Sequence, residues 1–447
     1  MTLLIISPDY ASHLYPLAAL GTNWLEAGER VVVATGEATA SIVESFGFEH
    51  VHLQLSRGSN PGVIRAEEQP DGEDDALRGF FAATRLGMVQ TLAFQAEARM
   101  NDLMWEPVKT AKAVQKIVEE VKPTTIIVDH LAFSARLGMV AAGIEHIDVV
   151  LGHPTALPLP AAAEVYGLPP AWPTAFSPED QEIEELRNLC TRVSESFTSE
   201  WNSALAQLAP QLPPSPDAFA EHGDVLVFNY PGELMTEERT GHLPPHVFIG
   251  SSVRAESAED HIEAWLSESD EPFVYVSFGS FLSVRGDVLN KVVTALKESN
   301  IRAAVAYGSA GAESLGEVPE NWLVGEFLPQ VTLLGSAAAA VTHGGNNSVT
   351  ESLTFGVPTV VLPFSTDQFA GAAALENIGF GAALAPNTAT VQELRLALGA
   401  MLSLPQDTRD ELHSLGQSLR DGAGSAQLRA ALAKATGPSR QDPSRVG

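Results

Sequence analysis

Apolar runs of four or five residues alternate with helical patterns along the first half of the chain. In the stretch from Pro16 to Ala27, Leu17, Leu20 and Trp24 fall on one helical face, and Gly28 closes the helix. Strands separated by helices are typical of a parallel sheet with right-handed crossovers. The predicted strands of this half are Leu3–Ile6, Val31–Ala34, Thr125–Val128, Asp148–Leu151 and Val225–Phe228.

The same alternation starts again in the second half. Its predicted strands are Phe273–Ser277, Ala303–Tyr307, Leu323–Glu326, Ala338–Thr342 and Thr359–Leu362. We therefore expect an α/β protein with two doubly wound, Rossmann-like domains that face each other across a cleft. The expected domains are 1–242 and 254–420, with a proline-containing linker at 243–253. Residues 421–447 are expected to form a C-terminal helix and tail, for which a return to the first domain is an open alternative.

Composition and charge exclude several classes of function. The 447 residues include 26 Lys and Arg against 56 Asp and Glu, so the formal net charge is −30, which disfavours nucleic acid and anionic membranes as partners. The single cysteine, Cys190, excludes an intrachain disulfide framework. Apolar runs are too short to span a bilayer, and the chain enters a strand at once without a basic leader, so a cytoplasmic location is expected.

A glycine turn in the second domain predicts an anion site. The sequence "HGGNNS" from His343 to Ser348 follows a predicted strand and opens a helix, yet no Lys or Arg lies between Arg302 and Arg395. A helix N-terminus binds phosphate through free backbone N–H groups, so basic side chains are not required. The alternatives are a strand-end histidine and a capping box in which Glu351 binds back to the start of its own helix.

Two polar residues follow predicted strands of the first domain. His13 lies after the first strand and Asp129 after Thr125–Val128. Because the carboxyl ends of parallel strands share one edge of the sheet, both side chains should emerge there. A histidine oriented by an aspartate can take a proton from a hydroxyl group. The alternatives are an exposed loop histidine and an aspartate that caps a helix.

Three consecutive segments resemble the donor-binding signature of the UDP-glycosyltransferases of the GT-B fold. They are "EFLPQVTLL", "THGGNNSVTESLTFGVPTVVLPFSTDQ" and "NIGFGAAL", and Phe327 and Asn346, where plant members commonly carry Trp, resemble the bacterial, natural-product or macrolide type. The resemblance implies that His13 is the catalytic base and Asp129 its partner. The implied donor-binding residues are Phe327 and Gln330 for the base, His343, Gly345, Asn347 and Ser348 for the diphosphate, with Ser280 facing them, Glu351 for the ribose, and Asp367 and Gln368 for the sugar.

The resemblance further implies an inverting hexosyltransferase without a metal. UDP-glucose is the favoured donor because the Asp367 and Gln368 side chains need hydroxyl partners. A dTDP-deoxysugar donor, a nucleotide-sugar epimerase and a non-catalytic nucleotide-sugar-binding helper remain alternatives. Apolar residues of the first domain suggest a lipophilic acceptor such as a macrolide, polyketide or phenol. The candidate acceptor residues are Phe81, Met88, Phe133 and His153.

Overall fold

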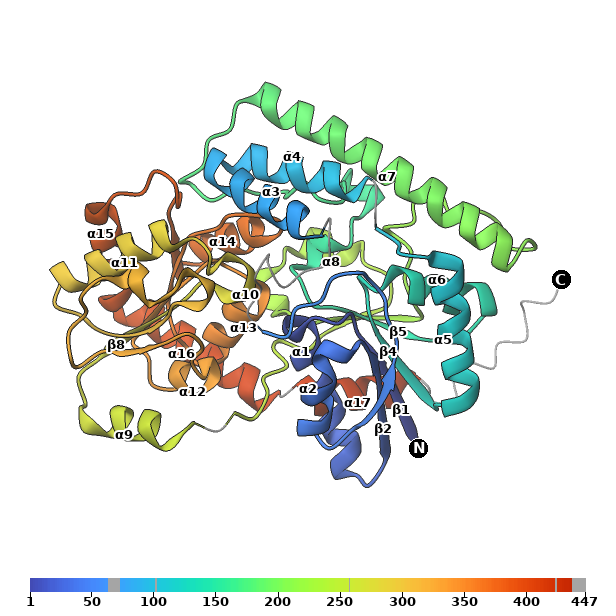
Figure 1. Cartoon of the computed structure of the whole chain (residues 1–447), viewed down its shortest axis with the longest axis horizontal. Coiled ribbons are helices and arrows are strands. Elements are labelled where there is room, and N and C mark those ends of the chain that lie inside the picture. The colour runs from blue at the N-terminus through green and yellow to red at the C-terminus, as the bar shows by residue number, and fades with distance from the viewer. Residues whose placement is uncertain (63–72, 101–102, 257, 423, 436–447) are drawn as a thin grey trace.

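The computed structural model describes residues 1–62, 73–100, 103–256, 258–422 and 424–435. Within these residues the chain forms one seven-stranded and one six-stranded parallel sheet, each flanked by helices (Figure 1). The prediction of two doubly wound domains is confirmed. The two sheets have separate apolar cores, because each sheet buries its own alternating set of valine, isoleucine and leucine side chains.

The first sheet has the strand order β3-β2-β1-β4-β5-β6-β7. Its strands are β1 (Thr2–Ile6), β2 (Arg30–Thr35), β3 (Glu49–His52), β4 (Thr125–Asp129), β5 (Ile147–Val150), β6 (Val225–Phe228) and β7 (His246–Phe248). Its helices are α1 (Ala11–Glu26), α2 (Ala40–Ser45), α3 (Glu73–Leu86), α4 (Met88–Arg99), α5 (Pro107–Val121), α6 (Phe133–Ala142), α7 (Asp180–Leu208) and α8 (Glu237–Gly241). The sequence pattern missed β3, because this edge strand is half-exposed and mostly polar.

The second sheet has the order β10-β9-β8-β11-β12-β13. Its strands are β8 (Phe273–Ser277), β9 (Arg302–Ala306), β10 (Leu323–Gly325), β11 (Ala339–Thr342), β12 (Thr359–Val361) and β13 (Gly381–Ala383). Its helices are α9 (Asp260–Glu268), α10 (Gly279–Leu282), α11 (Gly286–Glu298), α12 (Gln330–Leu334), α13 (Asn346–Thr354), α14 (Gln368–Asn377), α15 (Val391–Leu402) and α16 (Gln406–Asp421).

Strand order fixes where a site can form. In the first sheet β1 lies between β2 and β4, and in the second β8 lies between β9 and β11. At such a switch point the connections leave toward opposite faces of the sheet, which opens a crevice at the carboxyl ends of the strands. His13 lies in the first turn of α1, just after β1, and Asp129 is the last residue of β4. Ser280 lies in α10, just after β8, and His343 directly follows β11. The two predicted halves of the site therefore lie at the two crevices.

The expected linker at 243–253 is partly wrong. Its residues His246–Phe248 form β7, which pairs in parallel with β6 and completes the first sheet. Pro244 and Pro245 stand just before this strand, where the missing N–H groups cost no ladder hydrogen bonds. The prolines thus mark the start of an edge strand, and the passage to the second sheet follows it.

The C-terminal helix lies against the first domain. Helix α17 (Gly424–Ala435) packs on α1 (Figure 1). Leu428 of this helix is fully buried in the same apolar core as Leu3 and Ile5 of β1. Arg429 donates to the carbonyl of Asn23 at 3.0 Å and forms an ion pair with Glu29. The chain therefore crosses from the second domain back to the first. The predicted tail after Ala435 lies outside the described residues.

Candidate active site

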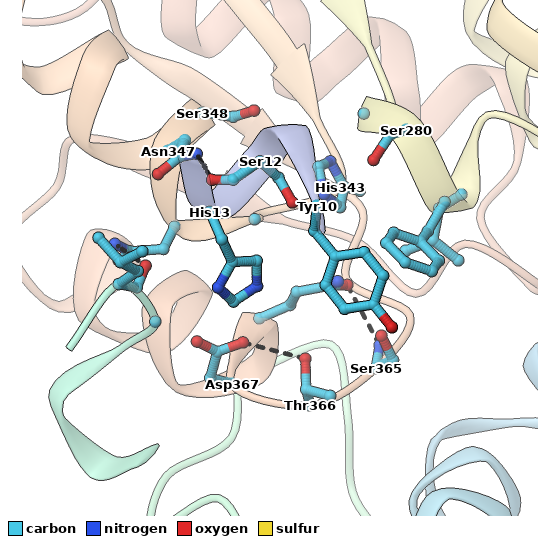
Figure 2. A pocket seen from close by; sticks show the side chains of 18 of the residues that line it. Tyr10, Ser12, His13, Ser280, His343, Asn347, Ser348, Ser365, Thr366 and Asp367 are labelled. Atoms are coloured by element: carbon cyan, nitrogen blue, oxygen red, sulfur yellow. Dashed lines mark hydrogen bonds between the residues drawn. The ribbon is translucent and has the colours of Figure 1, made fainter. Parts of the chain in front are cut away.

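A cavity of about 680 Å³ lies between the two sheets and is lined by residues of both domains. His13 and Ser12 reach it from the first domain, and Ser280, His343, Asn347, Ser348 and Asp367 reach it from the second (Figure 2). All of the donor-binding residues predicted from the sequence line this cavity. The structure therefore brings the predicted base and the predicted donor residues together.

His13 and Asp129 form a direct pair. The His13 Nδ1 atom lies 2.6 Å from Asp129 Oδ2, and the Asp129 carboxylate is fully buried. The other oxygen, Asp129 Oδ1, accepts a hydrogen bond of 2.9 Å from the backbone N–H of Leu131. A carboxylate only accepts, so Nδ1 carries the proton and Nε2 keeps its lone pair. Figure 2 shows the His13 ring pointing toward Asp367 within the pocket.

The local charges favour the ionised form of the pair. Burial disfavours imidazolium, but the charge and the hydrogen bond of Asp129 outweigh burial, so the pKa of His13 is raised above its usual value. Burial likewise opposes the Asp129 carboxylate, and His13 outweighs it, so the pKa of Asp129 is lowered. Asp129 therefore stays ionised and stabilises a proton on the His13 ring.

The glycine turn forms the start of α13. Gly344 adopts a left-handed conformation with φ of +84°, and Gly345 is the N-cap residue. A Cβ atom on Gly345 would lie 2.4 Å from His343 Nε2, so the glycine lets the histidine ring lie against the turn. Burial lowers the pKa of His343 to about 4, which keeps this ring neutral near pH 7. The first N–H groups of α13 are thus presented to the cavity beside a neutral imidazole.

Two asparagines at the start of α13 reach across to the first domain. Asn347 Nδ2 donates to the carbonyl of Ser12 at 2.7 Å. Asn346 Nδ2 donates to the carbonyls of Leu151 and Asn229 at 2.7 and 3.0 Å. The Asn347 amide, predicted to hold the diphosphate, thus binds in this structure to the first turn of α1, which carries His13.

Glu351 faces the cavity and forms no capping box. Helix α13 has no side-chain cap, and Glu351 Oε2 accepts a 2.6 Å hydrogen bond from Gln330 Nε2. Burial raises the pKa of Glu351, although Arg254 and Gln330 oppose that rise. The Arg254 guanidinium lies 3.6 Å from Glu351 and 2.5 Å from Glu256. Arg254 is a cation at the donor side of the cavity that sequence reasoning missed, because it lies far from the glycine turn in the sequence.

The loop before α14 is held in a strained conformation. Thr366 is a non-glycine residue with φ of +52°, and its hydroxyl donates to Asp367 Oδ1 at 2.9 Å. Asp367 Oδ2 accepts a hydrogen bond of 2.5 Å from the backbone N–H of His153 in the other domain. Gln368 Oε1 accepts from the backbone N–H groups of Phe364 and Ser365. These contacts fix the Asp367 carboxylate in the cavity, where it retains lone pairs for further donors.

Phe327 and Ser280 are two further residues of the second domain that line the cavity. The Phe327 ring is 61% exposed at the cavity edge, which leaves a face for stacking. Ser280 accepts a 3.0 Å hydrogen bond from Asn60 Nδ2 of the first domain. Asn60 is fully buried, and nothing in the sequence around it signalled this contact between domains.

The four predicted acceptor residues do not line the cavity. Phe133 lies in an aromatic core with Phe197 and Phe219, and Met88 is buried between α4 and α7. Phe81 does not line the cavity, whereas its neighbour Phe80 does. The His153 ring is buried against Tyr230, and Nδ1 lies 2.8 Å from the Thr155 hydroxyl. The structure thus places all four outside the cavity wall, because helical spacing does not separate core positions from cavity positions.

Other residues of the first domain form the wall on the acceptor side. They come from the loop after β1, from α3 and α4, and from the segment after η4 (Pro160–Ala162). Their side chains are mainly apolar or aromatic, which suits a lipophilic molecule. The residues are Tyr10, Leu77, Phe80, Phe94, Gln95, Arg99, Tyr166, Leu168 and Pro169.

In the part of the chain that the structure describes, no group of three or more His, Cys, Asp or Glu side chains could hold a metal ion. Among the same residues, no helix is both long and apolar enough to cross a membrane.

Comparison with known proteins agrees with this geometry. Residues 192–411 match the family model described as UDP-glucoronosyl and UDP-glucosyl transferase. Demethyllactenocin mycarosyltransferase of Streptomyces fradiae is 26% identical over 396 residues, which cover 86% of this chain and 76% of the relative. The uncharacterised UDP-glucosyltransferase YojK of Bacillus subtilis (strain 168) is 28% identical over 211 residues, 47% of this chain; the match spans about half (51%) of YojK.

The fold also matches solved structures over nearly the whole chain. The spinosyn rhamnosyltransferase SpnG in complex with thymidine diphosphate aligns with a TM-score of 0.64 at 17% identity, covering 96% of this chain and 99% of the other. At this identity the likeness establishes the fold, which is GT-B.

Proposed function

We propose that this chain, which has the GT-B fold, belongs to the UDP-glycosyltransferase family and moves a sugar from a nucleotide sugar to a hydroxyl group of a lipophilic small molecule. The observation that carries the proposal is the His13–Asp129 pair, which meets the N-terminal end of α13 in one cavity. A base and an anion site on opposite walls suit a displacement in which a hydroxyl loses a proton while a diphosphate leaves.

The proposed reaction is a single inverting displacement. His13 Nε2 takes the proton of the acceptor hydroxyl, whose oxygen attacks the anomeric carbon of the sugar. The bond from that carbon to the donor diphosphate breaks, and its electron pair leaves with the diphosphate. The proton remains on His13, and the buried Asp129 carboxylate stabilises the imidazolium. Attack from the face opposite the leaving group inverts the anomeric configuration.

The leaving diphosphate gains negative charge on the second-domain side. Free N–H groups at the start of α13 and the positive end of the helix dipole would stabilise that charge. Gly345 permits close approach of the phosphate, and Ser348 lies in the same wall. Backbone N–H groups would thus take the place of basic side chains, which the glycine turn does not have. We propose no metal for the reaction.

UDP-glucose is the donor we propose first. Asp367 lies in the cavity with both oxygens fixed by hydrogen bonds, so it would accept further hydrogen bonds from a hydroxyl-rich hexose. Glu351 would accept from the ribose hydroxyls, and Phe327 would stack on the base. A dTDP-deoxysugar is the second candidate, because relatives include a mycarosyltransferase and a structural neighbour that binds thymidine diphosphate.

The test measures transfer directly. The protein is incubated with UDP-glucose or dTDP-glucose and a panel of macrolides, polyketides and phenols, with and without EDTA, and products are identified by mass spectrometry. The anomeric proton coupling of the product reports inversion. His13→Ala should lower kcat by about 10²–10⁴. His52→Ala, which removes an exposed histidine on β3, is the matched control.

Full turnover by a folded His13→Ala protein would remove His13 as the base. Retained anomeric configuration in the product would contradict a single displacement. Binding of a nucleotide sugar without transfer to any acceptor would instead favour the non-catalytic helper.

A further inference from the structure

Among the residues that the structure describes, two arginines line the cavity, and their surroundings differ. Arg254 on the donor side pairs with Glu256 and lies near Glu351. Arg99 lies on the acceptor side, at the end of α4, and packs over the ring of Tyr166 with its Cζ 5.1 Å from the ring centroid. No residue of the described chain forms an ion pair or a hydrogen bond with the Arg99 guanidinium. In a chain with 56 acidic and 26 basic residues, a cation without a carboxylate partner calls for an explanation.

The position of Arg99 is fixed by its packing. Tyr166 is buried and stacks on Phe219, with ring centroids 3.8 Å apart. Gly167 adopts φ of +88°, and a Cβ atom there would lie 3.0 Å from Arg99 Nη1. The glycine therefore leaves room for the guanidinium beside the aromatic ring. A planar guanidinium held on an aromatic face keeps its N–H edge available for a planar anion.

A second polar group lies one helical turn away. Gln95 precedes Arg99 by four residues on α4, so both side chains share one face of that helix, and both line the cavity. The Oε1 atom of Gln95 is buried and has no hydrogen-bond partner within the described residues. An amide oxygen and a guanidinium that no described residue pairs form a polar subsite in a mainly apolar wall.

This subsite lies within electrostatic range of the reacting centre. Burial raises the pKa of Tyr166; Arg99 lowers that pKa, and the carboxylates of Asp367 and Asp129 raise it further. Tyr166 is therefore close enough to Arg99 and to both carboxylates for their charges to act on it. One acceptor molecule could place a hydroxyl at His13 and an anionic group at Arg99.

We propose that the acceptor carries a carboxylate, which Arg99 binds while the reacting hydroxyl lies at His13. This inference rests on the proposed function and narrows its acceptor class to hydroxylated, lipophilic carboxylic acids. Arg99 donates to both carboxylate oxygens, and Phe80 and Phe94 contact the apolar body. Gln95 Oε1 only accepts, so it would take a hydrogen bond from a hydroxyl group of the same acceptor. Arg99 is a specificity-determining residue here, because it acts on the acceptor and on no bond that is made or broken.

A structural role is the competing explanation. Arg99 stands in the last turn of α4, where a cation stabilises the helix dipole. That role would affect folding and would not distinguish an acid from its ester. The experiment therefore compares two acceptors that differ only in charge.

The probes are 6-hydroxy-2-naphthoic acid and its methyl ester, assayed with the best donor. We expect the wild type to prefer the acid in kcat/KM. Arg99→Met should reduce the ratio of acid to ester by about 10–100-fold, since it removes a charge-assisted pair, and Arg99→Lys should keep part of the preference. Arg78→Met is the control: Arg78 is an exposed residue of α3 that pairs with Asp75 and does not line the cavity. Its ratio should stay within about twofold of the wild type.

Fluorescence titration of the naphthoate in the presence of UDP separates this inference from the proposed function. If the wild type binds the acid more tightly than Arg99→Met does but transfers no sugar, the carboxylate site is supported and the proposed transferase activity is contradicted. If the wild type and Arg99→Met both transfer the sugar equally well to acid and ester, the carboxylate site is overturned and the proposed transferase activity is still supported. Circular dichroism and UDP binding confirm that each variant is folded.

Discussion

The side-chain amide of Asn347 donates a 2.7 Å hydrogen bond to the carbonyl of Ser12, the residue before His13. Asn347 is the second residue of α13 in the second domain, whereas Ser12 lies in the first turn of α1, directly before His13. The Asn347 side chain therefore joins the start of α13 to the turn that carries His13, together with the other hydrogen bonds between the domains (Figure 2). A shift of about 1 Å in the position of a catalytic group can cost 10²-fold in rate.

Asn347→Ala should therefore lower kcat by about 10-fold or more and change the Kd of UDP by less than about threefold. Isothermal titration with UDP and steady-state kinetics measure the two effects. Asn290→Ala is the control, because it removes an amide from α11 that binds only the nearby carbonyl of Ser314. If Asn347→Ala instead weakens UDP binding more than it lowers kcat, the amide holds the diphosphate, as the sequence resemblance predicted.

The dependence of activity on pH should report His13. Asp129 raises the pKa of His13 above 6.5 despite the opposing effect of burial, and a base acts only when neutral. The value of kcat/KM should thus rise with pH through a midpoint above 6.5. In Asp129→Asn the charge is gone while burial remains, so the midpoint should move to lower pH. The plateau should fall as well, because the amide no longer fixes the tautomer. An unchanged midpoint in the variant would show that another group controls the profile.

Much of the fold followed from local pattern. The central strands are buried on both faces, so runs such as Leu3–Ile6 and Val225–Phe228 stand out as continuous apolar segments. Edge strands did not stand out: β3 is largely polar, and β13 consists of glycine and alanine. The pairing of His13 with Asp129 was predictable because neighbouring parallel strands end at one edge of the sheet.

Contacts between the domains could not be derived in the same way. The hydrogen bonds from Asn347 to Ser12 and from Asn60 to Ser280 depend on how two separately folded units face each other. No periodicity within either unit encodes that orientation. The residues of the acceptor wall could not be predicted for a related reason. Phe80 and Phe81 are adjacent on one helix, and only the packing of that helix decides which ring reaches the cavity.

Gly345→Ala should damage the donor site. The new Cβ atom would meet His343 Nε2 at 2.4 Å and Cε1 at 2.8 Å, so the ring must move out of the turn. We expect the Kd of UDP to rise by about 10-fold or more, since charge-assisted hydrogen bonds of the turn are lost. Gly399→Ala is the matched control within α15, where an added Cβ meets nothing within 4 Å. That control should bind UDP normally and gain about 0.5–1 kcal/mol in the free energy of unfolding. Normal UDP binding by Gly345→Ala would mean that the turn does not hold the diphosphate.

The return of the C-terminal helix should contribute to the stability of the first domain. Leu428 on α17 is fully buried and belongs to the same apolar core as Leu3 and Ile5 of β1. Leu428→Ala should lower the free energy of unfolding by about 2–5 kcal/mol, because it leaves a cavity in that core. Urea denaturation followed by tryptophan fluorescence suits the measurement, since Arg429 of the same helix packs over Trp24.

Leu396→Ala provides the comparison for this last variant. Leu396 is 64% exposed on α15, so its truncation should change the free energy of unfolding by less than about 0.5 kcal/mol. If the two variants are equally stable, α17 does not dock on the first domain in solution. If only Leu428→Ala loses stability, the crossing helix belongs to the folded core of the first domain. Because α17 follows the second domain in the chain and packs on the first, it then ties together the two halves that carry His13 and the glycine turn.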